Sequence, residues 1–370
     1  PAMPVQFIGM IQPHEVSETI PRKGPAVDPA YVRVFAQAHE HAGFDRILVP
    51  ASSSSPDTLL TVNYAASVTD RIKFLLAHRP GFVAPTLAAR QLATLDHYTG
   101  GRVAVHYITG GSDEDQQRDG DFVDHDERYA RTDEYLGLLR QVWTADKPFD
   151  HEGAYYRVKG AWSEVKPVQA PYVPIYFGGA SAPALQVAGK HADVYALWGE
   201  SLEQAGDLVR RVRAEAARHG RTVQFSISFR PILGATEDEA WARAYRILEE
   251  TRRLRVDQGY ARGGPQQSEG ARRLLADAAK GDRVDEHLWT AIARETGGRS
   301  NTTSLVGTPE QAANALLRYY DLGITTFLIR GFDPLLDAIA YGRDLLPLVR
   351  AKVAEREAER AAQPAERKAA

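Results

Sequence analysis

The sequence contains no cysteine, only two methionines, and no marked excess of charge of either sign. Without cysteine, the chain can form no disulfide framework, no thiolate metal site and no cysteine nucleophile. Its 45 basic and 48 acidic residues give a net charge of −3, so no overall field favours nucleic acid or a membrane surface. No apolar run approaches the ~18 residues that a membrane-spanning helix needs. We therefore expect no nucleic-acid or membrane partner. Because the N-terminal residues lead into a strand without a secretory leader pattern, we also expect a cytoplasmic location.

One pattern recurs along the 370 residues: the end of a helix, one or two polar residues, and then a short apolar run. These runs predict eight strands, within residues 5–10, 41–50, 67–79, 97–110, 174–179, 189–199, 224–233 and 320–331. Amphipathic helical stretches lie between them, at 29–42, 85–98, 128–144, 201–218 and 308–321. Continuous apolar strands followed by helices indicate a parallel sheet. Eight such units predict a TIM-like (β/α)8 barrel, an α/β fold that would occupy residues 1–370 as a single domain.

Three segments depart from this rhythm. Residues 146–173 are rich in Pro, Gly and aromatic residues, which predicts an inserted hairpin. Residues 257–304 form a long Arg-containing insertion with Gly-rich ends. Such an insertion is often a lid over the active site of a barrel, and a structural excursion or dimer arm is an equally good interpretation. Residues 351–370 predict a charged helical tail with no chemistry assigned to it.

In a barrel, polar residues at the carboxyl ends of the strands carry function. The candidates after the first four strands are Gln12, His14, Ser55, His78, His106 and Thr109. Those after the last four are Gly178, Gly179, Ala180, Ser181, Trp198, Arg230, Arg330 and Phe332. Any one of these residues could have a purely structural role, but together they predict a polar site at one mouth of the barrel. The histidine spacing does not predict a metal site.

The run "GGAS" at 178–181 predicts an anion cradle. Two glycines let the backbone approach a ligand, and Ser181 can cap the following helix, whose free N–H groups attract phosphate. A tight turn without a ligand would have the same sequence. Tyr129 lies at a helix start, where its phenol could reach a bound phosphate, although capping by Asp126 explains that local sequence equally well.

Paired carboxylates of the kind that glycosidases use are missing from the strand ends, where Arg and His dominate. Arginine forks favour an anionic substrate or intermediate. The long insertion adds Arg299, which lies in the Gly-rich run "TGGRSN" and could swing onto a ligand.

Several long runs resemble the bacterial-luciferase-like flavin monooxygenases, and within them the alkanesulfonate monooxygenase group. They are "LLAHRPGFVAPTLAARQLATLD" (75–96), the run "GGRVAVHYITGG" and its continuation (100–135), "PIYFGGAS" (174–181), "ALWGES" (196–201) and the last βα unit (304–331). The likeness covers nearly the whole chain. It implies a barrel that uses FMN as FMNH2, supplied by a separate NAD(P)H-dependent flavin reductase, and O2. It also implies a homodimer, packed through "DTLLTVNYAASV" and "PTLAARQLATL".

The resemblance implies a role for each candidate. His78, His106, Thr109 and Tyr129 would contact the flavin together with Gly178, Gly179, Ala180 and Ser181. His14, Arg230 and Arg330 would be catalytic, with His14 a candidate proton donor. Gln12, Ser55, Trp198, Arg299 and Phe332 would bind the substrate. The reaction would cleave the C–S bond of an organosulfonate and release sulfite and an aldehyde.

The substrate wall departs from the alkanesulfonate pattern. An Arg and a His two residues apart are replaced by Ser228 and Arg230, and a Cys is replaced by Ser55. A Tyr and a His after the last strand become Phe332 and Pro334. A more polar sulfonate such as sulfoquinovose, whose monooxygenase subgroup shares "AHRPGF" and "ALWGE", is therefore the first expectation. The alternatives are an alkanesulfonate, a sulfone or another small molecule as substrate, or a flavin-binding barrel without turnover.

Overall fold

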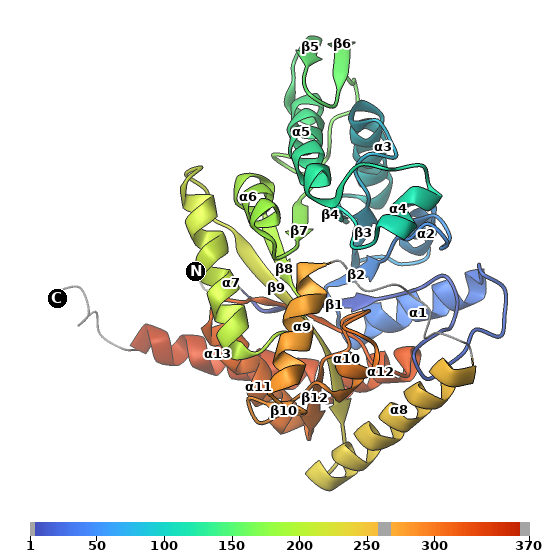
Figure 1. Cartoon of the computed structure of the whole chain (residues 1–370), viewed down its shortest axis with the longest axis vertical. Helices are drawn as coiled ribbons and strands as arrows, with labels where there is room; N and C mark the ends of the chain where they lie inside the picture. The colour runs from blue at the N-terminus through green and yellow to red at the C-terminus, as the bar shows by residue number, and fades with distance from the viewer. Residues whose placement is uncertain (1–3, 258–267, 363–370) are drawn as a thin grey trace.

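The computed structural model describes residues 4–257 and 268–362. Eight parallel strands close into a barrel with helices around it, which confirms the TIM-like α/β fold expected from the sequence (Figure 1). In barrel order they are β1 (Gln6–Met10), β2 (Arg46–Val49), β3 (Lys73–His78), β4 (Val103–Tyr107), β7 (Ile175–Gly178), β8 (Val194–Leu197), β9 (Gln224–Leu233) and β13 (Thr326–Ile329). Closure comes from β13 pairing in parallel with β1. All eight are the strands that the apolar runs predict.

Helix boundaries follow from local capping chemistry. The helix α1 (Pro29–Ala42) begins after Asp28, whose carboxylate accepts the N–H of Tyr31, and ends at Gly43, which has a φ of 89°. The other helices of the expected amphipathic stretches are α3 (Pro85–Thr99), α5 (His125–Thr144), α7 (Leu202–Ala217) and α11 (Pro309–Asp321). The helix α5 begins three residues before the expected start, because Asp126 and Glu127 in its first turn favour the positive end of the helix dipole.

The structure adds helices outside the five expected amphipathic stretches. Besides the two helices of the insertion over 257–304, they are α2 (Thr58–Ser67), α4 (Asp113–Arg118), α6 (Ala182–His191), α8 (Glu237–Asp257), α12 (Pro334–Asp344) and α13 (Leu346–Ala362). The expected charged tail over 351–370 falls partly on α13, and its residues from 363 onward lie outside the described ones. Within the described ranges, no helix combines the length and the apolar character needed to cross a membrane.

Residues 146–173 contain two antiparallel strands, β5 (Phe149–Glu152) and β6 (Arg157–Ala161). This hairpin lies beside α5 at one end of the long axis of the molecule, and α8 lies at the other end (Figure 1). Glu134 of α5 holds its turn, because the carboxylate accepts the backbone N–H groups of Tyr155 and Tyr156, each at 2.9 Å.

The insertion over 257–304 has structure of its own, except for residues 258–267, which lie outside the described part. It contains α9 (Glu269–Lys280), the short strands β10 (Arg283–Val284) and β11 (Leu288–Trp289), and α10 (Ala291–Glu295). The strand β12 (Ser304–Gly307) then pairs with the distal half of β9, beyond the barrel. The ten-residue β9 thus joins the barrel to this extension, and α9 lies in front of β8 and β9 in Figure 1.

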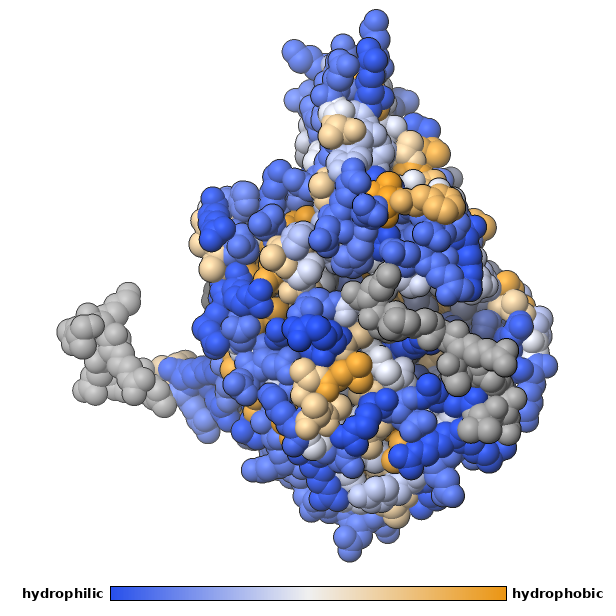
Figure 2. All heavy atoms as spheres, viewed as in Figure 1, coloured by the Kyte–Doolittle hydropathy of each residue, from blue (hydrophilic) through white to orange (hydrophobic). Residues whose placement is uncertain are grey.

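The core lies between the barrel strands and their helices. Alternate strand residues such as Phe7, Phe74, Phe177 and Phe225 are almost fully buried against it. Each buried aromatic side chain contributes roughly 2–3 kcal/mol of transfer free energy. The face seen in Figure 2 is largely hydrophilic, with apolar atoms in small separate patches. The packed barrel therefore leaves the loops at its carboxyl end as the place where a ligand can bind.

Candidate active site

Two adjoining cavities open at the carboxyl ends of the barrel strands. The larger has a volume of 760 Å³ and the smaller one of 570 Å³. Among the described residues, only Met10, Ser300 and Arg330 line both. We call these three residues the junction. A ligand in one cavity and a ligand in the other would meet at this point.

The smaller cavity collects six of the eight residues expected to bind a cofactor: His106, Thr109, Tyr129, Gly178, Gly179 and Ala180. Nδ1 of His106 and Oγ1 of Thr109 are buried and have no hydrogen-bond partner in the described part of the chain. Burial lowers the pKa of His106 to about 4, so its ring is neutral at pH 7. Burial also raises the pKa of Tyr129, which stays a protonated donor. A polar ligand in this cavity would supply hydrogen-bond partners for His106 Nδ1 and Thr109 Oγ1.

The "GGAS" run forms the turn that its sequence predicts. Gly179 has a φ of 107°, and a Cβ there would lie 2.9 Å from Cβ of Ala184 and 3.2 Å from the Tyr129 hydroxyl. Its carbonyl accepts a 2.6 Å hydrogen bond from the Tyr195 hydroxyl. Ser181 caps α6 by accepting the N–H of Ala184. Only glycine fits this turn, whose backbone leads into the positive end of a helix.

Two expected cofactor residues lie outside the set that lines the smaller cavity. His78 points between β3 and α5, where its Nε2 lies 2.7 Å from the Tyr135 hydroxyl. Burial and the charge of Arg79 lower the pKa of His78 to about 4. Ser181 acts through its cap and through a hydrogen bond with the Tyr129 hydroxyl. The sequence predicted that His78 lies at the carboxyl end of a strand, but it could not predict that the side chain points towards α5 and away from the cavity.

The larger cavity collects six of the residues expected to act on a substrate: Gln12, His14, Ser55, Arg230, Arg299 and Arg330. His14 is held by its Nδ1, which lies 2.6 Å from the Ala26 carbonyl oxygen. The Ser55 hydroxyl is engaged in the turn that begins at Ser52, accepting from the Ser52 N–H at 3.0 Å. Trp198 lines the smaller cavity instead.

Arg230 does not present a free guanidinium to an anion, contrary to expectation. Glu18 lies in the loop between β1 and α1, and its two carboxylate oxygens accept hydrogen bonds from Nη1 and Nη2 of Arg230 at 3.0 and 2.8 Å. Burial by itself would raise the pKa of Glu18, but the charge and hydrogen bonds of Arg230, with the charge of Arg330, lower it to about 2. The pair is therefore ionised and neutral overall at pH 7.

Phe332 also has a different place from the one expected. It is buried and lines neither cavity, and its ring lies 4.1 Å from the guanidinium carbon of Arg230. It therefore supports Arg230 by a cation–π contact and does not touch a substrate. Reasoning from strand ends missed Glu18 because it lies eight residues beyond β1. The only feature of the sequence that could have indicated Glu18 is that it is an acidic residue in the loop that also carries Gln12 and His14.

Arg330 is the cation at the junction that no carboxylate neutralises within the described residues. It donates to the carbonyl of Ser300. Burial and the charge of Arg230 lower the pKa of Arg330 to about 9, so it remains charged at neutral pH. With Glu18 paired to Arg230, the three groups carry a net charge of +1. The geometry thus places a positive charge where the larger cavity meets the smaller one.

The segment around Ser300 is held in an unusual backbone conformation. Ser300 and Asn301 have φ values of 58° and 47°, which side-chain-bearing residues rarely adopt. Asn301 fixes them by accepting the N–H of Gly199 at 2.8 Å and donating to the carbonyl of Ser228 at 2.9 Å. Because both partners follow or belong to barrel strands, the insertion is tied to the mouth at this point.

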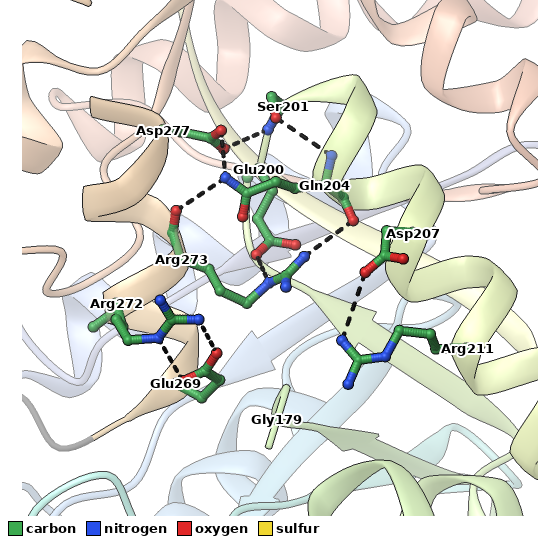
Figure 3. A network of polar contacts seen from close by, with 12 residues as sticks. Gly179, Glu200, Ser201, Gln204, Asp207, Arg211, Glu269, Arg272, Arg273 and Asp277 are labelled. Carbon is green, nitrogen blue, oxygen red and sulfur yellow. Dashed lines mark hydrogen bonds and ion pairs between the residues drawn. The ribbon is translucent and has the colours of Figure 1, made fainter. Parts of the chain in front are cut away.

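Glu200 is a second carboxylate that the sequence interpretation missed, although it lies in the quoted run "ALWGES". It lines the smaller cavity, is buried, and pairs with Arg273 of α9 (Figure 3). Its Oε2 has no partner among the described groups. Burial raises the pKa of Glu200 to about 7, against the opposing effect of Arg273. Nearby, Asp277 accepts the backbone N–H of Ser201 at 2.7 Å, so α9 is fixed to the start of α7.

We expect the raised pKa of Glu200 to make the protein less stable as pH rises from 4.5 to 7. The folded state then holds a proton that the unfolded chain has released, so the free energy of unfolding falls by about 3 kcal/mol over this interval. A Glu200→Gln variant should lack this loss, so its stability relative to the wild type should increase with pH. Urea midpoints at pH 4.5 and 8 measure the effect, with exposed Glu355→Gln as the matched control. A constant difference between wild type and Glu200→Gln would contradict it.

The fold and site define a barrel whose two cavities meet at the carboxyl ends of the strands, where barrel enzymes have their active sites. The family profile of the luciferase-like monooxygenases matches residues 7–326. The chain therefore belongs to the luciferase-like monooxygenase family. It is an oxidoreductase of the class that uses reduced flavin and O2.

Solved structures with the same fold include enzymes with very different substrates. A riboflavin lyase, solved with modified FMN and riboflavin, has a TM-score of 0.80 at 20% identity, covering 95% of this chain and 92% of its own. The EDTA monooxygenase of Chelativorans sp. BNC1 has a TM-score of 0.75 at 18% identity, covering 95% of each chain. A long-chain alkane monooxygenase has a TM-score of 0.75 at 19% identity, covering 96% and 92%. A polyanion and an alkane thus occur on one fold, so the substrate must be argued from the cavity itself.

Proposed function

We propose that this protein is a two-component monooxygenase that uses FMNH2 in the smaller cavity to cleave the C–S bond of an organosulfonate in the larger one. The observation that carries the proposal is Arg330, a cation at the junction of the two cavities that pairs with no carboxylate among the described residues. A sulfonate there would supply the missing negative charge. Bound reduced FMN would supply the electrons that activate O2.

The residues around the smaller cavity fit FMN. The Gly179 turn and the start of α6 suit a phosphate, because a close backbone and a helix N-terminus both favour an anion. His106 Nδ1 and Thr109 Oγ1, which have no partner in the part of the chain that the structure describes, would pair with polar atoms of the flavin. The neutral ring of His106 avoids burying a second charge there.

The larger cavity would bind and orient the substrate. Arg330 would hold the sulfonate, and Arg299 from the insertion would contact it. Arginine stays protonated and is a poor proton donor, so its contribution is charge stabilisation. His14 is the candidate proton donor, since it lines this cavity and imidazole is a common general acid in enzymes. The paired Glu18 and Arg230 would form a fixed polar wall.

The size and lining of the larger cavity favour a polar sulfonate such as sulfoquinovose over a short alkanesulfonate. Its volume of 760 Å³ exceeds the needs of a two-carbon chain. The Ser54 hydroxyl and the Gln12 amide line it and offer hydrogen bonds that a sugar can use and an alkyl chain cannot, whereas the Ser52 and Ser55 hydroxyls bond to each other. An alkanesulfonate, a sulfone or another small molecule is the alternative.

Sulfite release in a single turnover tests the function. Enzyme with photoreduced FMN would be mixed with O2 and sulfoquinovose, methanesulfonate, longer alkanesulfonates or dimethyl sulfone. We expect sulfite from the sulfonated sugar. Sulfite mainly from alkanesulfonates would favour the alternative, and no sulfite from any compound would reject C–S cleavage of these substrates.

The Gly179 turn gives a test of FMN binding that is independent of the substrate. We expect Gly179→Val to weaken FMN binding at least about 100-fold, because a side chain there clashes with Ala184 and forces a strained φ that deforms the cradle. Fluorescence titration with FMN measures the change. The matched control is Gly220→Val, also at a positive φ (62°) but with open space around its Cβ, which should bind FMN normally. Equal affinities for the Gly179 and Gly220 variants would contradict the placement of the phosphate.

Two partners are part of the proposal. A separate NAD(P)H-dependent flavin reductase would deliver the reduced flavin. A second copy of the chain would pack on α2 and α3, where Leu60, Leu87 and Tyr98 are exposed, with fractional exposures of 66%, 38% and 81%. Such large exposed apolar side chains on neighbouring helices favour a homodimer.

A further inference from the structure

We propose that Met10 is the site at which this enzyme oxidises itself when reduced flavin and O2 react without a substrate. The inference rests on the proposed function, because it places reduced FMN in the smaller cavity and the substrate in the larger. Oxygen must then pass between the two ligands at the junction. Met10 lines both cavities there, at the carboxyl end of β1, and is only partly buried.

Met10 is the one oxidisable group at the junction. Its partners there, Ser300 and Arg330, carry a hydroxyl and a guanidinium, which peroxide chemistry leaves unchanged under mild conditions. A thioether accepts an oxygen atom readily and becomes a sulfoxide. The chain has no cysteine to compete for the oxidant. When the larger cavity holds no substrate, the sulfur of Met10 is the nearest acceptor that the junction offers.

The reaction balances without another reagent. Reduced FMN, O2 and the thioether give FMN, water and methionine sulfoxide. One oxygen atom forms the S=O bond and the other leaves as water. Reduced FMN supplies two electrons and the sulfur supplies two, which together reduce O2 fully.

Oxidation at this position would have a functional consequence. A sulfoxide is polar and bulkier than a thioether, and it would stand between the two cavities beside the charged Arg330. We therefore expect activity to decline with each substrate-free turnover. A bound substrate would protect Met10 by taking the oxygen atom first.

The two methionines of the chain make the test direct, because chymotryptic cleavage after Phe7 separates Met3 from Met10. Holoenzyme would be cycled with photoreduced FMN and O2 in the presence of catalase, and sulfoxide at each position would be measured by mass spectrometry. A parallel sample without reduced flavin would receive hydrogen peroxide instead. The ratio of oxidation at Met10 to that at Met3 is then compared between the two samples.

We expect the ratio under turnover to exceed that under added peroxide by about tenfold or more, since an oxidant formed beside the sulfur has a high effective concentration. Equal ratios would overturn the proposal, because they would show that peroxide in solution does the oxidation. Sulfoquinovose should lower the ratio. If sulfite release fails for every substrate while the ratio stays high, the substrate assignment is wrong and the oxidation site stands. If sulfite is released and the ratios are equal, the substrate assignment stands and the oxidation of Met10 is rejected.

A variant gives a second readout. Met10→Leu keeps a similar apolar volume but has no oxidisable sulfur. Whatever its starting rate, we expect it to retain most of its own initial activity after substrate-free turnover that inactivates the wild type. Parallel loss in both proteins would overturn a causal role for Met10 oxidation.

Discussion

Arg330→Gln should lower kcat/KM for a sulfonate by about 10²–10³-fold, which corresponds to roughly 3–4 kcal/mol. Glutamine keeps an amide that can form hydrogen bonds, but it is shorter than arginine and cannot neutralise a sulfonate. The anion would then lie beside the neutral Glu18–Arg230 pair, and the junction would have lost its own cation. Removing one partner of a buried charged contact typically costs about 2–5 kcal/mol. Sulfite release measured over a range of substrate concentrations gives both kcat and KM.

A matched control separates this effect from the loss of any arginine. Arg33 is exposed on α1, away from both cavities, so Arg33→Gln should change kcat/KM by less than about twofold. Arg330→Lys keeps the charge but not the planar fork, so it should recover part of the loss. If Arg330→Gln is as active as Arg33→Gln, the junction does not bind the sulfonate and the proposed function loses its main support.

The sequence could predict the barrel because each strand corresponds to a short run of apolar residues that can be recognised locally. Runs such as "KFLLAH" and "VAVHY" are apolar throughout, as strands covered on both faces must be. The ends of these runs locate the mouth, so His106, Thr109 and Gly179 could be assigned to it without coordinates. These predictions depend on chain direction and periodicity, which neighbouring residues determine.

The partners of the charged groups could not be predicted in the same way. Arg230 and Glu18 are 212 residues apart, and nothing in either neighbourhood indicates that they pair. Glu200 pairs with Arg273, which belongs to the insertion over 257–304. The repeating pattern of strands and helices does not predict where such an insertion lies relative to the barrel. Such contacts decide whether an arginine is free to bind a substrate. The sequence therefore placed Arg230 and Arg330 in the same class, whereas the structure distinguishes them.

Glu18→Gln should destabilise the protein by about 3 kcal/mol at pH 7, because it leaves the buried guanidinium of Arg230 without its counter-charge. The pKa of Glu18 is depressed to about 2, so its ionised form stabilises the fold above the unfolded value of 4.5. This advantage of the wild type should shrink as pH falls from 4.5 towards 2. Urea midpoints over this range measure it, with Glu355→Gln as the control at an exposed position.

The double variant Glu18→Gln with Arg230→Met decides what the pair is for. If the pair is structural, removing both charges should restore much of the stability that Glu18→Gln loses, since no buried charge is left alone. Sulfite release should then also persist, because Arg330 still holds the sulfonate. A double variant that folds stably but binds the sulfonate about 100-fold more weakly would show that Arg230 contributes directly to the anion site. In that case substrate binding must draw the guanidinium away from Glu18, and the carboxylate would be a competitor of the substrate.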